Sequence, residues 1–201
     1  TLSIPRLKLR HWGSIVLIVI GSNVATHFIM NPATASMHTS IVNAPRSEKL
    51  YLEDRAEQHI FDIDGFKEKV RDAARKLKIP AAWLMAVIDQ ESQFNPTVAN
   101  FKGSGAVGLI QFMPGTAAEL GTSSQFLQMM DATAQMDYVY KYLSQVRKRY
   151  GEYESLTDLY LGILYPKARK QDPCYTLFAG PSTSYRQNSG LDHDKDQRVT
   201  I

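Results

Sequence analysis

The chain has 201 residues, enough for one good-sized domain with appendages. Hydrophobic residues make up 44% and charged residues 21%, which argues against overall disorder. The net charge of +3, with no run of Lys and Arg among aromatics, argues against nucleic acid as a partner, and the single Cys174 excludes an intrachain disulfide.

Residues 1–35 have the pattern of an export segment. The apolar run IVLIVI (15–20) follows three basic residues: Arg6, Lys8 and Arg10. This order is typical of a signal peptide, for which ATA at 33–35 offers a cleavage site. One alternative is an uncleaved membrane anchor over 12–30, close to the roughly 20 residues that cross a bilayer, and another is a buried core helix. A signal peptide or an anchor would carry the rest of the chain across the membrane, so we predict export.

The remainder divides into three predicted parts. Residues 36–48 are mostly small and polar and indicate a linker. Residues 49–170 carry helical signals throughout and are predicted to form the main domain. Residues 171–201 are then a C-terminal extension.

Apolar residues at helical spacing predict a mainly α domain, because no segment alternates with period two. On the first predicted helix one face carries Phe66, Val70, Ala73, Ala74 and Leu77. The helices are expected over 64–79, 81–90, 114–120, 136–150 and 156–165.

A glycine-rich loop lies between two of these helices, with Gly103, Gly105 and Gly108 in six residues. The loop lacks the Lys-Ser/Thr pair of a phosphate-binding P-loop, and no strand precedes it. We interpret it as a loop that lets the backbone approach a ligand closely.

The helix before this loop ends its apolar stripe in a carboxylate. Leu84, Val87 and Ile88 share a helix face with Glu91. Apolar neighbours and the negative end of the helix dipole both disfavour a charged carboxylate. Glu91 is therefore predicted to have a raised pKa and to act as a general acid. The alternative is an ordinary solvated Glu near a helix end.

The stretch ESQFNPTVANFKGSGAVGLIQFMPGTAAELG (91–121) resembles lytic transglycosylases of the soluble-transglycosylase type, which are relatives of goose-type lysozyme. The matching residues are Glu91, Ser92, Phe94, Pro96 and the run GAVGLIQFMPGTA at 105–117. The resemblance spans roughly residues 60–166. It implies a lysozyme-like α-helical domain with a groove, which cleaves the β-1,4 bond between N-acetylmuramic acid and N-acetylglucosamine in peptidoglycan.

The resemblance also implies a mechanism. Glu91 would first donate a proton to the glycosidic oxygen and then accept one from the muramic acid C6 hydroxyl, closing a 1,6-anhydro ring without water, metal or cofactor. Ser92 would support Glu91 by hydrogen bonding. The sugar groove would be lined by Gly108, Leu109, Ile110, Gln111 and Phe112, with backbone groups and the Gln111 amide binding N-acetyl groups.

The chain departs from the family pattern where a tyrosine in AYNAG should lie against the catalytic Glu. The corresponding stretch here is LYLGILYPKA. Aligning YPKA with YNAG selects Tyr165 as the catalytic tyrosine. Tyr160 is the alternative and is otherwise expected to pack in the core or along the groove.

The end of the chain, YRQNSGLDHDKDQRVTI, resembles the end of some phage-type members. Asp192, Asp194 and Asp196 have the first three ligand spacings of an EF-hand loop. Gln197 replaces the glycine of its sharp turn, and the sequence stops before the usual bidentate Glu. We therefore interpret these residues as a solvated tail and expect no metal.

These observations favour a peptidoglycan lytic transglycosylase that acts as a monomer on glycan strands in the periplasm or cell envelope, tethered to the membrane if the anchor is kept, or in a phage virion. One alternative is a muramidase that cuts the same bond with water. Another is a non-catalytic glycan-binding or virion structural module. A metal-dependent endopeptidase is disfavoured because the five histidines are scattered.

Overall fold

The computed structural model describes residues 49–100 and 104–201. The predicted export segment (1–35) and linker (36–48) lie outside the described residues, as does Gly103 of the glycine-rich loop. Within the described part of the chain, every helix is too short or too polar to cross a bilayer.

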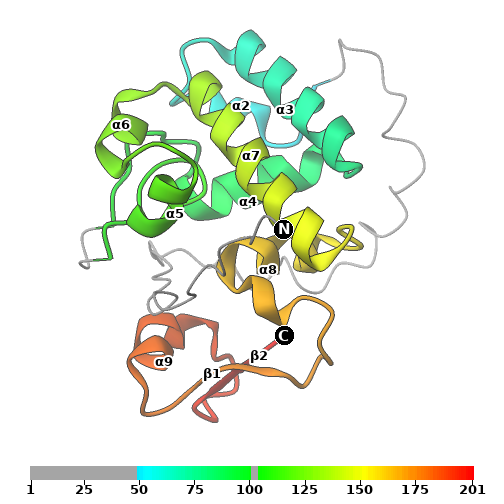
Figure 1. The fold of residues 1–201 in the computed structure, drawn as a ribbon, viewed down its shortest axis with the longest axis vertical. Coiled ribbons are helices and arrows are strands. Elements are labelled where there is room, and N and C mark those ends of the chain that lie inside the picture. The colour runs from blue at the N-terminus through cyan, green and yellow to red at the C-terminus, as the bar shows by residue number, and fades with distance from the viewer. Residues whose placement is uncertain (1–48, 101–103) are drawn as a thin grey trace, which may run out of the picture.

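The prediction of a mainly α protein is confirmed (Figure 1). The helical body consists of α2 (Glu53–Ala56), α3 (Ile63–Leu77), α4 (Ala81–Ser92), α5 (Pro114–Glu119), α6 (Ser124–Met129), α7 (Ala132–Tyr150) and α8 (Leu156–Leu164). The short helices α2 and α6 have no counterpart among the expected elements.

Side-chain caps explain where several helices begin. Asp62, Ser123, Asp131 and Ser155 each accept a hydrogen bond from a backbone N–H in the first turn of the helix that follows. Such caps satisfy donors that have no partner within the helix. Pro80 and Pro114 mark the starts of α4 and α5, so local sequence explains six of the seven helix starts in the helical body.

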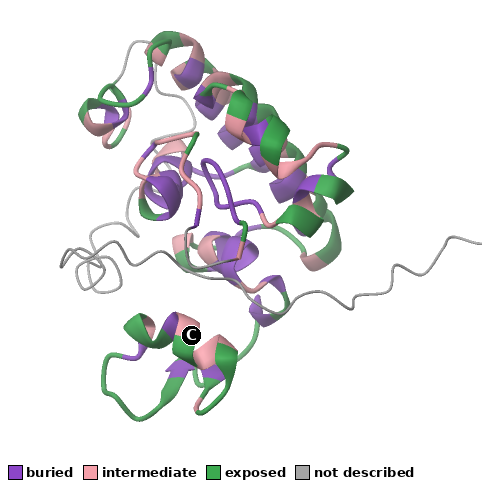
Figure 2. Cartoon of the chain, turned by 90° about the vertical axis from the view of Figure 1, so that its left-hand side faces the viewer, coloured by how far each residue is buried: buried purple, intermediate pink, exposed green. Residues whose placement is uncertain are grey.

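The core lies between α3, α4, α7 and α8. The predicted face of α3, from Phe66 to Leu77, is fully buried and packs against α7. Helix α4 packs against both α3 and α8, which places its last turn inside the body. Figure 2 shows the buried residues gathered between the helices, with a smaller buried group in the C-terminal unit.

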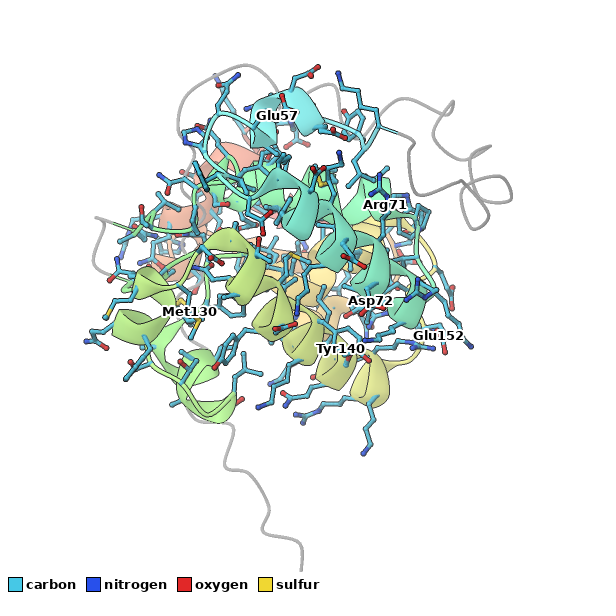
Figure 3. The ribbon with its side chains drawn as sticks, turned by 90° about the horizontal axis from the view of Figure 1, so that it is seen from above. Glu57, Arg71, Asp72, Met130, Tyr140 and Glu152 are labelled. Carbon is cyan, nitrogen blue, oxygen red and sulfur yellow. The ribbon has the colours of Figure 1, made fainter. Side chains whose placement is uncertain are left out.

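Charged side chains cover the outer seam between α3 and α7, where Figure 3 labels Asp72, Tyr140 and Glu152. Lys76 pairs with Asp72 at 2.6 Å and lies over the Tyr140 ring at 5.2 Å. Arg147 donates to the Lys76 carbonyl at 2.9 Å and also pairs with Glu152. These exposed contacts align the two helices on the surface that faces away from the core.

The expected solvated tail is instead a folded unit, so that interpretation was wrong. It comprises η2 (Pro166–Ala168), β1 (Thr176–Ala179), α9 (Thr183–Asn188), η3 (Ser189–Leu191) and β2 (Arg198–Thr200), with the two strands antiparallel. Phe178 and Val199 are buried against Leu164 at the end of α8. Helix α8 therefore joins this C-terminal unit to the helical body (Figure 1).

A buried ion pair fixes the start of α8 to the chain that follows it. The guanidinium of Arg169 donates to both carboxylate oxygens of Asp158, at 2.7 and 2.6 Å, and stacks 4.1 Å from the Tyr153 ring centroid. Because both partners are buried, removing either one would leave an unpaired charge in the interior.

Candidate active site

Glu91 lies in the last turn of α4, on the face that sequence periodicity predicted. Leu84, Val87 and Ile88 on that face are buried, and Glu91 itself is only 8% exposed. The apolar stripe of α4 thus carries the carboxyl into the interior, next to the loop that joins α4 to α5.

Burial raises the pKa of Glu91 to about 8, from an ordinary value of 4.5. No charged group of the described residues contributes to this shift. The helix dipole acts in the same direction, because Glu91 stands near the carboxyl end of α4. The predicted raised pKa is confirmed, and the carboxyl is largely protonated at neutral pH.

Asp89, two residues earlier, points to a different environment. Its Oδ2 accepts a hydrogen bond from Arg55 at 2.8 Å. Partial burial raises the pKa of Asp89, and the Arg55 charge opposes that rise. Asp89 therefore ties α4 to α2 and is no partner for Glu91.

The chain turns sharply after Glu91. Gln93 and Phe94 both adopt left-handed backbone conformations, with φ of 53° and 64°, which are costly for residues other than glycine. The Phe94 ring is fully buried and packs edge-to-face on Phe66, with centroids 6.3 Å apart. This packing offsets the cost of the turn and directs the following loop back over α4.

Ser92 holds that loop rather than the carboxyl beside it. Its Oγ lies 3.0 Å from the carbonyl oxygens of both Ile88 and Leu109. The expected hydrogen bond from Ser92 to Glu91 is therefore a wrong prediction. The residue fastens the predicted groove segment to the last turn of α4, where Glu91 lies.

The predicted groove segment is more deeply buried than a surface lining would be. The side chains of Leu109, Ile110 and Phe112 belong to the hydrophobic core. Gly108 has φ of 78° and donates to the Val98 carbonyl at 2.9 Å. A ligand could use only backbone groups of these residues, since their side chains face inward.

Gln111 is the polar side chain of this segment. Its φ of 52° is left-handed, and its Nε2 donates to the Gly108 carbonyl at 3.1 Å. Its Oε1 is buried and has no hydrogen-bond partner among the described residues. The amide is thus positioned by its own loop and retains a free acceptor.

Gln135 of α7 organises the segment, and sequence reasoning missed it. The residue is fully buried, and its Oε1 accepts from the Leu109 N–H at 2.9 Å. Its Nε2 donates to the carbonyls of Pro96 and Leu127, both at 2.7 Å. A Cβ on Gly108 would lie 2.4 Å from the Gln135 Oε1, so glycine is required there. The available signal was a polar residue on the apolar face of α7, in line with Ala132 and Val139.

Tyr160 is one of two buried tyrosines, with Tyr142, whose pKa the Glu91 charge raises. Burial raises the pKa of Tyr160 well above its usual value, and the Glu91 charge raises it further. The Tyr160 hydroxyl is buried without a hydrogen-bond partner among the described residues.

Tyr165, which the sequence alignment favoured, lies elsewhere. It follows the last residue of α8 and packs on Phe178 of the C-terminal unit, with ring centroids 6.0 Å apart. Burial, Tyr175 and Tyr150 raise its pKa, and Glu91 does not contribute. The preference for Tyr165 over Tyr160 as the neighbour of Glu91 is thus corrected.

Tyr142 completes the buried polar surroundings. Its hydroxyl donates to the Gly162 carbonyl of α8 at 3.0 Å, and its ring packs edge-to-face on Phe112. Burial raises its pKa, with the negative charge of Glu91 among the smaller contributions. Tyr142 therefore joins α7, α8 and the loop segment around the carboxyl.

Comparison with known families gives a match over this region. Residues 68–164 match the family model described as "Transglycosylase SLT domain". The match covers α4, the loop with Gly108 and Gln111, α7 and α8, and thus includes every residue described above as surrounding Glu91.

We predict that Gln135→Met destabilises the protein by about 2–4 kcal/mol, because the Leu109 N–H and the Pro96 carbonyl lose their hydrogen-bond partner and the Leu127 carbonyl keeps only the Met130 N–H. Urea unfolding measures this loss. Gln145→Met on the exposed side of the same helix is the matched control and should change little. Equal stabilities for the two variants would contradict the role assigned to Gln135.

We also predict that Glu91→Gln changes how stability depends on pH. Since the folded pKa is above the unfolded one, the wild type loses stability as pH rises from about 4.5 to about 8. At about 1.4 kcal/mol per pKa unit, the penalty removed by the variant reaches roughly 3 kcal/mol at pH 7. Urea unfolding at pH 5 and pH 8 should therefore show a gap that widens with pH.

The exposed Glu119→Gln serves as control for that comparison, because Glu119 lies on the surface at the end of α5. Its unfolding free energy should follow the wild type at both pH values. Parallel curves for Glu91→Gln and wild type would show that the carboxyl is not desolvated in solution.

Proposed function

Residues 68–164 form a transglycosylase SLT domain of the lysozyme-like superfamily, and from this premise we propose that the chain is a peptidoglycan lytic transglycosylase. The domain supports a glycan-cleaving role in general and implies peptidoglycan as the substrate. The proposal adds the bond and the product: the β-1,4 linkage from N-acetylmuramic acid to N-acetylglucosamine is cut, and 1,6-anhydro-N-acetylmuramic acid is formed.

The observation that carries the proposal is the lone buried carboxyl of Glu91, with its pKa of about 8. A group with this pKa is a protonated acid at neutral pH and can still act as a base after losing its proton. Glu91 gives its proton to the glycosidic oxygen while the bond from that oxygen to C1 breaks. The resulting carboxylate takes the C6 hydroxyl proton as O6 bonds to C1, which restores the acid without consuming water.

A single carboxylate favours this route over hydrolysis. Glycoside hydrolases usually employ two carboxyl groups, one to protonate the leaving oxygen and one as base or nucleophile. Among the described residues no second charged group affects Glu91, and the nearby Asp89 is engaged by Arg55. The internal C6 hydroxyl makes a second carboxylate unnecessary, whereas a muramidase would have to activate water with other groups.

Tyr160 is proposed to position and stabilise Glu91 after proton transfer. Its buried hydroxyl lacks a partner in the described part of the chain, so donation to the ionised carboxylate would satisfy both groups. Such a bond stabilises the charged form and keeps the pKa of Glu91 from rising further. Tyr165, packed on Phe178, has no such role in the proposal.

The substrate contacts are proposed to come from Gln111 and the loop backbone. The Oε1 of Gln111 is buried and unpartnered among the described residues, and it would accept the N–H of an N-acetyl group if substrate binding exposes it. Backbone groups of residues 108–112 would supply the remaining contacts along a glycan groove, since Ser92 and Gln135 hold that backbone in place. We further propose that the protein acts as a monomer after export to the cell envelope or from a virion, where this substrate occurs.

Purified sacculi incubated with the protein should release muropeptides with anhydro ends, which mass spectrometry identifies as one water lighter than reducing ends. Glu91→Gln should reduce release at least about 100-fold, the usual contribution of a general acid or base. The wild-type rate should fall as pH rises through about 8, because the acid form is lost. Reducing ends would instead identify a muramidase, and no release would leave only a binding module.

Tyr160→Phe should lower the rate about tenfold or more and move the alkaline limb of the pH profile to higher pH, because the charged carboxylate loses a donor. Tyr165→Phe is the matched control and should leave both the rate and the limb close to wild type. A reduced rate with an unmoved limb would indicate that Tyr160 is only structural.

A further inference from the structure

Three aspartates of the C-terminal unit converge between η3 and β2. One carboxylate oxygen from each of Asp192, Asp194 and Asp196 lies within 4.8 Å of the others. Asp194 and Asp196 are exposed, whereas Asp192 is only 8% exposed. Exposed acidic groups are common without a bound ion, so the buried Asp192 is the informative residue of the three.

The two carboxylate oxygens of Asp192 have different surroundings. Its Oδ2 accepts hydrogen bonds from the Tyr185 hydroxyl at 2.6 Å and from the Gln197 N–H at 3.0 Å. Its Oδ1 is buried and has no hydrogen-bond partner among the described residues. A buried carboxylate oxygen without a partner is costly. Two further carboxylates lie beside Asp192, and a bound cation would offset the cost of burying its oxygen.

We propose that Asp192, Asp194 and Asp196 bind a calcium ion. Carboxylate oxygens are the ligands that hard cations prefer, and Ca²⁺ accepts an irregular set of six to eight oxygens more readily than Mg²⁺, which demands a near-ideal octahedron. The spacing of the three residues equals that of the first, third and fifth ligands of an EF-hand loop. Water and backbone oxygens would complete the coordination.

The sequence objection to such a site was that Gln197 stands where a glycine normally makes the turn. In the structure Gln197 makes that turn with φ of 67° and still donates its N–H to Asp192. The following strand β2 then buries Val199 against Leu164 and Phe178. The loop thus tolerates glutamine because a buried residue two positions later anchors it.

A site with three carboxylate ligands, completed by water and backbone oxygens, is expected to bind weakly, on the order of 0.1–1 mM, as in extracellular modules. The ion would fix the loop that leads into β2, and β2 packs on the end of α8 through Val199. Calcium is therefore expected to stabilise the C-terminal unit. The prediction that the chain binds no metal would then be wrong.

The test uses the full chain, freed of metal by chelation and dialysis, with Tb³⁺ as a luminescent probe for Ca²⁺ sites. Tyr185 donates to Asp192 and should sensitise bound Tb³⁺ when tyrosine is excited. We expect saturable luminescence that CaCl₂ displaces with a midpoint near 0.1–1 mM. CaCl₂ should also raise the melting temperature of the metal-free protein.

The test variant is Asp194→Asn combined with Asp196→Asn, because both residues are exposed and asparagine keeps the Oδ1 acceptors that bond the loop backbone. Circular dichroism checks that it folds. The matched control is Asp172→Asn, an exposed aspartate of the same unit whose Oδ1 accepts from the Cys174 N–H. The double variant should lose at least tenfold in affinity, and the control should bind as the wild type does.

Absence of saturable Tb³⁺ luminescence, or of any CaCl₂ effect up to 10 times the expected midpoint, would overturn the proposal. Unchanged affinity in the double variant would overturn it as well, because binding would then lie elsewhere. Neither result bears on Glu91, since the readouts do not involve glycan cleavage.

Discussion

The desolvation of one carboxyl group is the constraint on which the rest of the structure depends. Removing Glu91 from water raises its pKa to about 8 and costs stability whenever the group is charged. The surrounding helices must supply that free energy, through the apolar face of α4 and its packing on α3 and α8. The acid strength and the core packing are therefore two consequences of the same burial.

Residues 106–112 of the loop after α4 are buried together with Glu91, in the interior where each backbone group needs a partner. Ser92 and Gln135 supply these partners: Ser92 bonds the Leu109 carbonyl, and Gln135 bonds the Leu109 N–H. Both polar groups of one residue are thus satisfied by side chains from two different helices. The loop keeps a fixed distance from Glu91 because α4 and α7 each hold it, which a loop stabilised only by its own contacts would not achieve.

Sequence periodicity was sufficient for features that depend on one helix. The buried face of α3 and the burial of Glu91 both follow from spacing along a single element, whereas α7 begins at Ala132, four residues before its expected start. Features that depend on two elements were missed or misjudged. Ser92 was expected to bond its sequence neighbour but bonds a residue seventeen positions away, and Gln135 was not singled out at all. Motif alignment preferred Tyr165. The sequence alone did not reveal that α8 ends just before this residue, which instead packs on Phe178 of β1.

Helix α8 holds Tyr160 against the core although the chain lacks the AYNAG stretch. Tyr160 contacts both the main core and the small core of Phe178 and Val199, so its ring is fixed from two sides. Within α8, Gly162 lets the Tyr153 ring approach closely, and its carbonyl accepts a hydrogen bond from the Tyr142 hydroxyl. The C-terminal unit therefore helps to hold Tyr160, a tyrosine whose pKa the charge of Glu91 raises, although this unit is far from Glu91 in sequence.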